Sequence, residues 1–274
     1  MEPVSPSEVE FHIQNLKNSK QNIDSISIPI LKEFRGFLSL IIADLINKCF
    51  ETGVFPKPFK KAIVLPLYKK DSPDLMTNYR PISILPKLSK IIEKCLKSRL
   101  LHYFTRNKLF NQVQFGFLAE LSTQDAMLHL TEKIYSNLHR ELSTLAVYVD
   151  FSKAFDTLNR SILLKKLAIY GIRGIPLELF KSYLDERFQA VKVNNIISEF
   201  KPINAGVPQG SVLGPILYLI YVNEIPSISD KFSTCLFADD TALIFENSNK
   251  YDLFNQCDYG VNLFFHGAVP IGYL

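Results

Sequence analysis

The chain of 274 residues lacks the features that mark secreted, membrane-spanning and zinc-stabilised proteins. Its four cysteines lie far apart and form no CxxC pair, which argues against a disulfide framework or a zinc cluster. The most apolar early stretch, residues 37–46, is too short to span a bilayer and contains Asp44. The first residues include acids and no apolar run, unlike a signal peptide. We therefore expect an intracellular protein, in the cytoplasm or nucleus, with no membrane or disulfide partner.

Motifs of the common hydrolases and nucleotide-binding loops are also missing. The sequence contains neither GxSxG nor HExxH, and its five histidines are isolated from one another. The glycine-rich stretch around Gly210 is not followed by GK[ST], so it is not a P-loop. With 47% hydrophobic and 21% charged residues, the chain has the composition of a folded globular protein.

Charge is unevenly distributed along the chain, although the net charge is only +4. Eleven Lys and Arg stand against three acids between Lys57 and Arg99, whereas three basic residues stand against seven acids from Lys201 onward. This asymmetry is compatible with a polyanion bound in one place and a cation in another. A solvated helix face with regularly spaced lysines is the alternative interpretation.

Hydrophobic periodicity predicts a mixture of helices and strands, hence an α+β or mixed α/β fold. Strands are expected at 61–68 and 144–150, and hairpins around Asn194-Asn195 and around Asp239-Asp240, with the two acids as the turn. Pro66 favours an edge position or a bulge, and not a central position, for the first strand. Helices are expected at 7–17, 28–52 (one helix or a pair), 88–104, 122–138 with Ser122 and Asp125 as a capping box, 161–170, 176–185 and 211–223.

Three carboxylates stand beside apolar strands. Asp150 ends one strand, and Asp239 and Asp240 lie between two others. An acid pair alone is typical of an ordinary turn. If the strand ending at Asp150 lies beside the hairpin, however, the three charges gather at one sheet edge and need divalent cations. Carboxylate ligands suit Mg²⁺, and two Mg²⁺ can promote nucleotidyl transfer.

An ordered set of motifs carries a resemblance to a known family. The motifs are KKAIVLPLYKKD, NYRPISILPKLSKIIEKCL, QFGF with STQDA, VYVDFSKAFDTLNR, GVPQGSVLGPILYLIYVNEIP and LFADDTALI. In this order, over residues about 5–262, the chain resembles the reverse transcriptase domain of non-LTR (LINE-type) retrotransposons. The resemblance implies an α+β right-hand polymerase with fingers and a ferredoxin-like palm, an antiparallel sheet with packed helices. It implies an RNA-directed DNA polymerase that adds dNTPs to a primer on an RNA or DNA template.

The resemblance also implies roles for individual residues. Asp150, Asp239 and Asp240 would be the catalytic metal ligands for two Mg²⁺, with Mn²⁺ as a substitute. Phe155 would lie under the sugar of the incoming nucleotide and exclude a 2′-OH. The other implied nucleotide-binding residues are Lys70, Arg80, Phe151, Gln209 and Gly210. The implied nucleic-acid contacts are Lys87, Lys90, Lys94 and Lys97.

The same resemblance suggests how the chain is divided. It implies a helical extension at 1–55, a basic fingers-like region at 56–140, and a palm-like catalytic region at 141–262. A fingers insertion is expected near 185–205. Residues 263–274 resemble nothing in the family and are expected to be a divergent tail.

The family pattern breaks after the acid pair. Only 34 residues follow Asp240 and the chain contains no Trp, whereas the family continues into a primer-gripping hairpin and a helical thumb. We expect the thumb to be missing and polymerase activity to be impaired by truncation, because a primer end must be held about 3 Å from the α-phosphate. One alternative is a non-catalytic nucleic-acid-binding remnant or domesticated module. Another is a host interaction domain, in which Asp150 and Asp239 would lie far apart.

Overall fold

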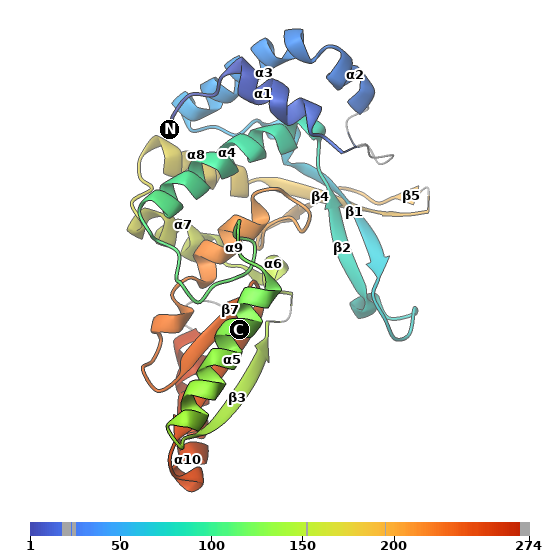
Figure 1. Cartoon of the computed structure of the whole chain (residues 1–274). Coiled ribbons are helices and arrows are strands. Elements are labelled where there is room, and N and C mark those ends of the chain that lie inside the picture. The colour runs from blue at the N-terminus through green and yellow to red at the C-terminus, as the bar shows by residue number, and fades with distance from the viewer. Residues whose placement is uncertain (18–22, 24–25, 152, 195, 269–274) are drawn as a thin grey trace. The chain divides into compact units, whose positions relative to one another are not determined.

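The computed structural model describes residues 1–17, 23, 26–151, 153–194 and 196–268 (Figure 1). Helices and strands are mixed along the chain, which confirms the predicted α+β class. The chain forms two compact units, each built from two separate segments. The first unit is Met1–Tyr103 with Leu164–Gly214, and the second is Phe104–Leu163 with Pro215–Leu274.

Helices at the N-terminus open the first unit and confirm the predictions made for 7–17 and 28–52. They are α1 (Pro6–Gln14), α2 (Ile28–Glu33) and α3 (Arg35–Thr52). The stretch 28–52 is a pair of helices separated at Phe34. Helix α3 ends where Gly53 takes a φ of +70°, a conformation that glycine adopts without strain.

Three further predicted helices are present. They are α4 (Lys87–Arg106), α7 (Arg160–Ile169) and α8 (Ile175–Leu184). Helix α8 lies in the first unit and packs on α3. Helices α4 and α7 each continue across the division between the two units.

A five-stranded sheet completes the first unit, in the order β2-β1-β4-β5 with β6 also paired to β4. Its strands are β1 (Lys61–Tyr68), β2 (Tyr79–Ile84), β4 (Arg187–Val193), β5 (Ile196–Ile197) and β6 (Lys201–Ile203). The edge position predicted for β1 is wrong, because β1 pairs with β2 on one side and β4 on the other. Pairing with β4 covers only Lys61–Val64, so Pro66, which has no N–H to donate, lies beyond it.

The second unit is built on an antiparallel sheet in the order β3-β8-β7. Its strands are β3 (Ser143–Asp150), β7 (Ser233–Phe237) and β8 (Asp240–Asn247). Phe237 pairs with Asp240, so the two-residue turn is Ala238-Asp239 and not the predicted Asp239-Asp240. Ala238 takes the left-handed φ of +59° in this turn. Aspartate suits a turn, so an acid pair in the sequence does not show which two residues form the turn. The pairing of β7 with β8 fixes that register.

Helices cover both faces of this sheet (Figure 1). On one face, Ala126 of α5 (Thr123–His139) packs with Ala242 and Ile244. On the other, Phe264 of α10 (Lys250–Ala268) packs against Phe232, which also contacts Phe245. Alternate residues of a strand point to opposite faces, which separates Ala242 and Ile244 from Phe245. Helix α5 begins with the predicted capping box of Ser122 and Asp125.

The remaining elements are one buried helix and several short segments. Helix α9 (Gly214–Val222) confirms the apolar helix predicted at 211–223, and Ile216–Val222 are buried. The other short elements are α6 (Ala154–Thr157) and the 3-10 turns η1 (Lys57–Lys60), η2 (Met76–Asn78) and η3 (Ile225–Ser227). All four cysteines are free thiols. Within the described ranges, no helix combines the length and apolar character needed to cross a bilayer.

Parts of two predictions lie outside the described residues. β4 and β5 pair antiparallel, in agreement with the predicted hairpin, but Asn195 is outside them. In the predicted tail 263–274, residues 263–268 continue α10, and 269–274 are outside the described residues. The fourfold division of the chain proposed from the sequence stays a prediction.

Candidate active site

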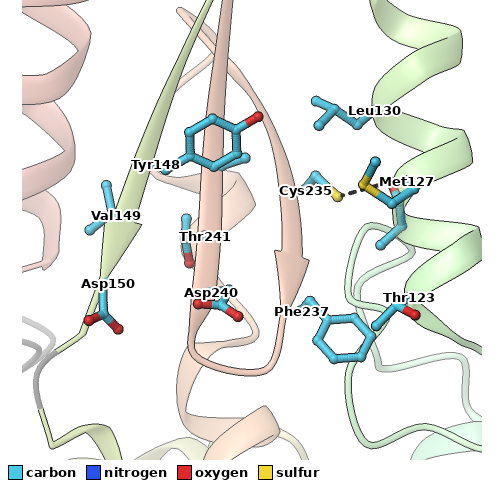
Figure 2. Close-up of a pocket in the computed structure, with 12 residues that line it drawn as sticks. Thr123, Met127, Leu130, Tyr148, Val149, Asp150, Cys235, Phe237, Asp240 and Thr241 are labelled. Atoms are coloured by element: carbon cyan, nitrogen blue, oxygen red, sulfur yellow. Dashed lines mark hydrogen bonds between the residues drawn. The ribbon is translucent and has the colours of Figure 1, made fainter. Parts of the chain in front are cut away.

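Asp150 and Asp240 lie side by side at one end of the second unit's sheet. Asp150 is the last residue of β3, Asp240 is the first residue of β8, and the two are register partners. Paired residues on antiparallel strands have Cβ atoms about 4.5–5.5 Å apart and point to the same face. Figure 2 shows both carboxylates at this end of the sheet. Strand pairing, and not proximity in sequence, therefore brings these two acids together.

Asp239 joins them from the adjoining turn. Burial and the negative charges of Asp239 and Asp150 raise the pKa of Asp240. Burial also raises the pKa of Tyr218 on α9, with further contributions from all three aspartates. One buried hydroxyl therefore experiences the field of the whole trio, so the host interaction domain, which needs distant acids, is not supported.

The chemistry of this trio fits a divalent cation. No Lys or Arg is among the groups that act on the pKa of Asp240, so within the described residues its charge is not offset by a side-chain cation. The Tyr218 hydroxyl is buried and has no hydrogen-bond partner in the described part of the chain. Carboxylate oxygens are the ligands that Mg²⁺ prefers. The residues present would suit such an ion, and their role as ligands stays a prediction.

Phe155 is held beside this trio by aromatic packing. Its ring, on α6, stacks on Tyr218 with centroids 5.0 Å apart and an angle of 28°. The ring of Phe117 meets it edge-on at 6.2 Å. Phe151, by contrast, is buried, with its ring centroid 6.2 Å from that of Phe264. Of the two predicted nucleotide-binding aromatics, Phe155 is the half-buried one and Phe151 lies in the core.

A pocket of about 390 Å³ lies between α5 and the sheet, beside Asp150 and Asp240 (Figure 2). Met127 and Leu130 line it from α5, and Tyr148 and Phe237 line it from the sheet. The Cys235 thiol joins the two layers through a contact of 3.6 Å from Sγ to the Ala126 carbonyl oxygen. The acids therefore stand at the edge of a largely apolar pocket.

Comparison with known proteins supplies the deciding observation. The sequence matches the family described as reverse transcriptase (RNA-dependent DNA polymerase) over residues 67–258, a range that contains all three aspartates and Phe155. The chain belongs to the reverse transcriptase family.

Curated relatives support the same assignment. The chain is 31% identical over 264 residues to a probable RNA-directed DNA polymerase from transposon BS of Drosophila melanogaster, covering 90% of this chain and 28% of the relative. It is 33% identical over 219 residues to the polymerase from the mobile element jockey of the same species, covering 76% and 23%. The chain spans about a quarter of the length of these relatives. These comparisons confirm the resemblance to non-LTR reverse transcriptases.

In this reverse transcriptase domain, the predicted nucleotide-contacting loop lies in the first unit and is fastened to β2. The Ser83 amide donates to the Gln209 carbonyl oxygen at 2.7 Å. Gly210 has a φ of +112°, and a Cβ there would lie 2.8 Å from the Ser83 carbonyl oxygen. Only glycine fits this close backbone approach. The predicted roles of Gln209 and Gly210 are thus compatible with a rigid loop.

Glu93 of α4 holds the same loop, and the sequence reasoning missed it. It is fully buried, and its Oε2 accepts hydrogen bonds from the amides of Val212 at 2.6 Å and Leu213 at 3.3 Å. Ser89 Oγ donates to Oε1 at 3.0 Å. Burial raises the pKa of Glu93, although these bonds and Arg187 oppose the rise. The available signal was an acid on the apolar face of an otherwise basic helix.

The predicted basic residues are in different environments. Arg80 and Lys70 are exposed in the first unit, and Arg80 on β2 is paired with Leu67. Lys87 is only 5% exposed, and its Nζ donates to the Ile26 carbonyl oxygen at 2.8 Å. The prediction that Lys87 contacts nucleic acid therefore does not fit its burial.

The other three predicted lysines of α4, Lys90, Lys94 and Lys97, are half-buried and not fully solvated. Burial lowers the pKa of Lys94, with a further contribution from Lys90. The helix is packed on several sides, so its lysines form no freely exposed row.

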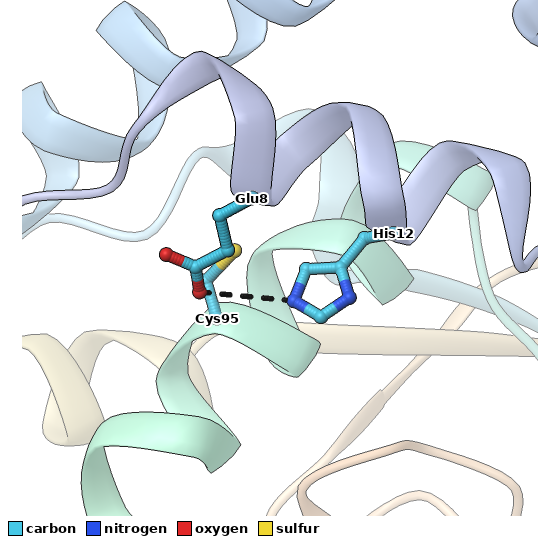
Figure 3. A group of neighbouring side chains, drawn as sticks. All are labelled: Glu8, His12 and Cys95. Carbon is cyan, nitrogen blue, oxygen red and sulfur yellow. Dashed lines mark ion pairs between the residues drawn. The ribbon is translucent and has the colours of Figure 1, made fainter.

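A separate group in the first unit, Glu8, His12 and Cys95, brings three candidate ligand atoms within 4.8 Å of one another (Figure 3). Among the described residues no other such trio reaches that separation, so the aspartate oxygens are spaced more widely. Arg99 donates to both Glu8 oxygens, from Nη2 at 2.8 Å and from Nη1. Burial raises the pKa of Cys95 to about 12, which opposes thiolate formation. We therefore interpret the group as the surroundings of the Glu8–Arg99 ion pair, which fastens α1 to α4.

Proposed function

We propose that this chain is the polymerase part of an RNA-directed DNA polymerase of a non-LTR retroelement. In the proposed reaction, the 3′-oxygen of a primer forms a bond to the α-phosphorus of a dNTP, and the bond to pyrophosphate breaks. The primer hydroxyl loses its proton and the pyrophosphate leaves with the electron pair. The register pairing of Asp150 with Asp240, inside the range matched to the family, carries this proposal.

The three aspartates would hold two Mg²⁺, for which Mn²⁺ could substitute. Such ions supply Lewis acidity: they favour deprotonation of the attacking hydroxyl and neutralise charge on the leaving pyrophosphate. The chain's part is to fix the carboxylates in advance. Asp150 and Asp240 are fixed by strand pairing, and Asp239 by the turn between β7 and β8. Preorganised charge of this kind lowers the cost of assembling the transition state.

Phe155 would select the deoxyribonucleotide. Its ring is backed by Tyr218 and flanked by Phe117, so it has little freedom to move away from a 2′-OH. Gln209 and Gly210 would contact the incoming nucleotide, while Arg80 and Lys70 would bind its triphosphate. Arg suits bidentate contact with phosphate oxygens, and Lys supplies a point charge.

In the right-hand description of polymerases, we assign the second unit to the palm. An antiparallel sheet with its acids at one end and helices on both faces supports this assignment. The sheet of the first unit would then belong to the fingers, with β4, β5 and β6 as the insertion expected near 185–205.

The test combines metal binding with primer extension. Mn²⁺ affinity of the full chain is measured by electron paramagnetic resonance, and extension of a primed RNA template is measured with dNTPs and Mg²⁺. Asp150→Asn should lower both, with extension reduced by a factor on the order of a thousand. Asp258→Asn, an exposed acid on α10, is the matched control and should change neither.

The two readouts separate the possible failures. Extension that survives Asp150→Asn would contradict the catalytic assignment. Mn²⁺ binding without extension, together with salt-sensitive template binding, would favour the non-catalytic nucleic-acid-binding alternative. Failure of the wild-type chain to bind Mn²⁺ more tightly than Asp150→Asn would remove the metal site itself.

A further inference from the structure

A short segment of the second unit, residues 113–116, runs beside β7 and reaches the turn before Asp240. The Leu236 amide donates to the Val113 carbonyl oxygen, and the Phe115 amide donates to the Leu236 carbonyl oxygen, both at 2.8 Å. Gln114 is thereby paired with Leu236 in a parallel bridge. Because β8 lies on the other side of β7, the segment extends the sheet and has a fixed register relative to the turn.

The side chain of Gln114 binds the turn directly. It is 1% exposed, and its Oε1 accepts hydrogen bonds from the amides of Ala238 at 3.0 Å and Gly116 at 2.8 Å. The first residue of a two-residue hairpin turn has no partner in the strand ladder for its N–H. Ala238 is only 6% exposed, so water does not readily replace that partner. Gln114 therefore satisfies a donor that the hairpin itself leaves open.

Gly116 allows the segment to lie this close. A Cβ at Gly116 would be 2.3 Å from the Ala238 backbone nitrogen and 2.9 Å from its Cα. Both atoms belong to the backbone of the turn, so they cannot move aside without moving the turn. The segment can therefore contact the turn only because residue 116 is a glycine.

The turn decides where Asp239 points. Asp240 is fixed by pairing with Phe237 and with Asp150, but Asp239 lies in the turn and has no strand partner. Its direction follows from the backbone of Ala238, which is held at a φ of +59°. A residue that fixes Ala238 therefore controls the third carboxylate more than the other two.

We propose that Gln114 and Gly116 are positioning residues that fix the Ala238-Asp239 turn, and with it the Asp239 carboxylate, for divalent-cation binding. This inference rests on the proposed function, since it concerns the same metal site. Gln114 acts through the backbone of the turn and does not need to contact the ion. A neutral carboxamide accepts two hydrogen bonds there without adding a fourth negative charge beside the aspartates.

The experiment compares Gln114→Met with the wild-type full chain. Methionine preserves the length of the side chain and removes the acceptor. Mn²⁺ affinity, measured by electron paramagnetic resonance, should fall about tenfold. Hydrogen exchange of the Ala238 amide, measured by NMR, should accelerate because its acceptor is lost. Gln114→Asn, whose side chain is too short to reach both amides, should behave in the same way if Gln114→Met does not fold.

Two further variants separate positioning from a general loss of stability. Asn137→Leu removes another fully buried carboxamide of the second unit, one that donates to Thr144 Oγ1 at 3.0 Å from Nδ2. It should lower stability but leave Mn²⁺ affinity unchanged. Gln114→Glu keeps an acceptor oxygen, so hydrogen exchange of the Ala238 amide should stay as slow as in the wild type; the Nε2 atom that this variant replaces has no hydrogen-bond partner in the described part of the chain.

Glycine variants test the second residue. Gly116→Ala should lower Mn²⁺ affinity at least as much as Gln114→Met, whereas Gly36→Ala, with open space around its Cβ, should leave it unchanged. A folded Gln114→Met chain that binds Mn²⁺ within twofold of the wild type would overturn this inference alone. A wild-type chain that binds Mn²⁺ no better than Asp150→Asn would overturn the proposed function, and this inference with it.

Discussion

At the scale of single residues, several functional candidates are held in place by a few contacts each. Phe155 is placed by the Tyr218 ring, and the loop at Gln209 and Gly210 is placed by Ser83 and Glu93. Each of these contacts joins residues that are distant in sequence. Loss of a partner should therefore change a measurable property of the site before it unfolds the chain.

Phe155→Val should weaken discrimination against ribonucleotides. The smaller valine side chain at position 155, which rests on the Tyr218 ring, leaves room for a 2′-OH. The ratio of kcat/KM for dNTP to that for rNTP should therefore fall on the order of tenfold or more. Single-nucleotide incorporation on a primed RNA template measures the ratio. Tyr218→Phe keeps the stacked ring and should leave the ratio unchanged. An unaltered ratio in Phe155→Val would show that this ring does not face the sugar.

Glu93 should make stability depend on pH. Burial raises the pKa of Glu93 in the folded chain above its usual value of 4.5, so the native state holds this proton more tightly than the unfolded state. The contribution of the protonated Glu93 side chain to the free energy of unfolding is complete below the pKa that this group has in the unfolded chain. It is lost as the pH rises through the higher pKa of the folded chain. The slope within that window is at most about 1.4 kcal/mol per pH unit.

The measurement is urea unfolding from pH 4 to 8. In Glu93→Gln, which cannot ionise, the free energy of unfolding should decline less as the pH rises. Glu199→Gln, an exposed acid of the same unit, is the control and should follow the wild type. Parallel curves for the wild type and Glu93→Gln would rule out titration of Glu93 in this range.

At the scale of elements, strand register and helix caps decide what the site contains. The pairing of β3 with β8 puts Asp150 opposite Asp240, and a shift by one residue would send one acid to the other face. Helix α5 covers the face to which both acids now point, and contributes Ala126 to the core there. The start of α5 is fixed locally: the Ser122 amide donates to Asp125 Oδ2 at 2.7 Å, and the Ser122 side chain accepts from the Asp125 amide.

Ser122→Ala should destabilise α5. It removes the acceptor of the capping box, and the expected loss in the free energy of unfolding is about 1 kcal/mol. Chemical denaturation followed by circular dichroism measures it. Ser136→Ala, an exposed position within the same helix, should be neutral or slightly stabilising because alanine favours helix. Equal effects of the two substitutions would contradict a role for the cap.

At the scale of the whole molecule, the chain passes between the two units several times, but the basic stretch and the three aspartates each belong to one unit. The chain passes between the two units after Tyr103, Leu163 and Gly214, so neither unit is continuous in sequence. The stretch from Lys57 to Arg99, with its excess of positive charge, lies in the first unit, and the three aspartates lie in the second. The proposed polyanion-binding and cation-binding residues therefore belong to different units.

Template–primer binding should therefore depend strongly on salt. Each phosphate contact contributes about −0.9 to the slope of log affinity against log salt concentration. Lys97→Gln should reduce the magnitude of that slope by about one contact, as measured by fluorescence anisotropy at several salt concentrations. Lys231→Gln, an exposed lysine of the second unit, is the control and should leave the slope unchanged. An unaltered slope in Lys97→Gln would remove this residue from the interface.

The sequence by itself determined the α+β class, most helices, the capping box and the family, because these follow from periodicity, local chemistry and ordered motifs. Only the tertiary structure decided that β1 is paired on both sides, that Asp240 begins a strand, and that Lys87 is buried. It also revealed Gln114 and Glu93 as residues that hold distant loops. The physical reason is that strand register, burial and long-range hydrogen bonds depend on which segments meet in space.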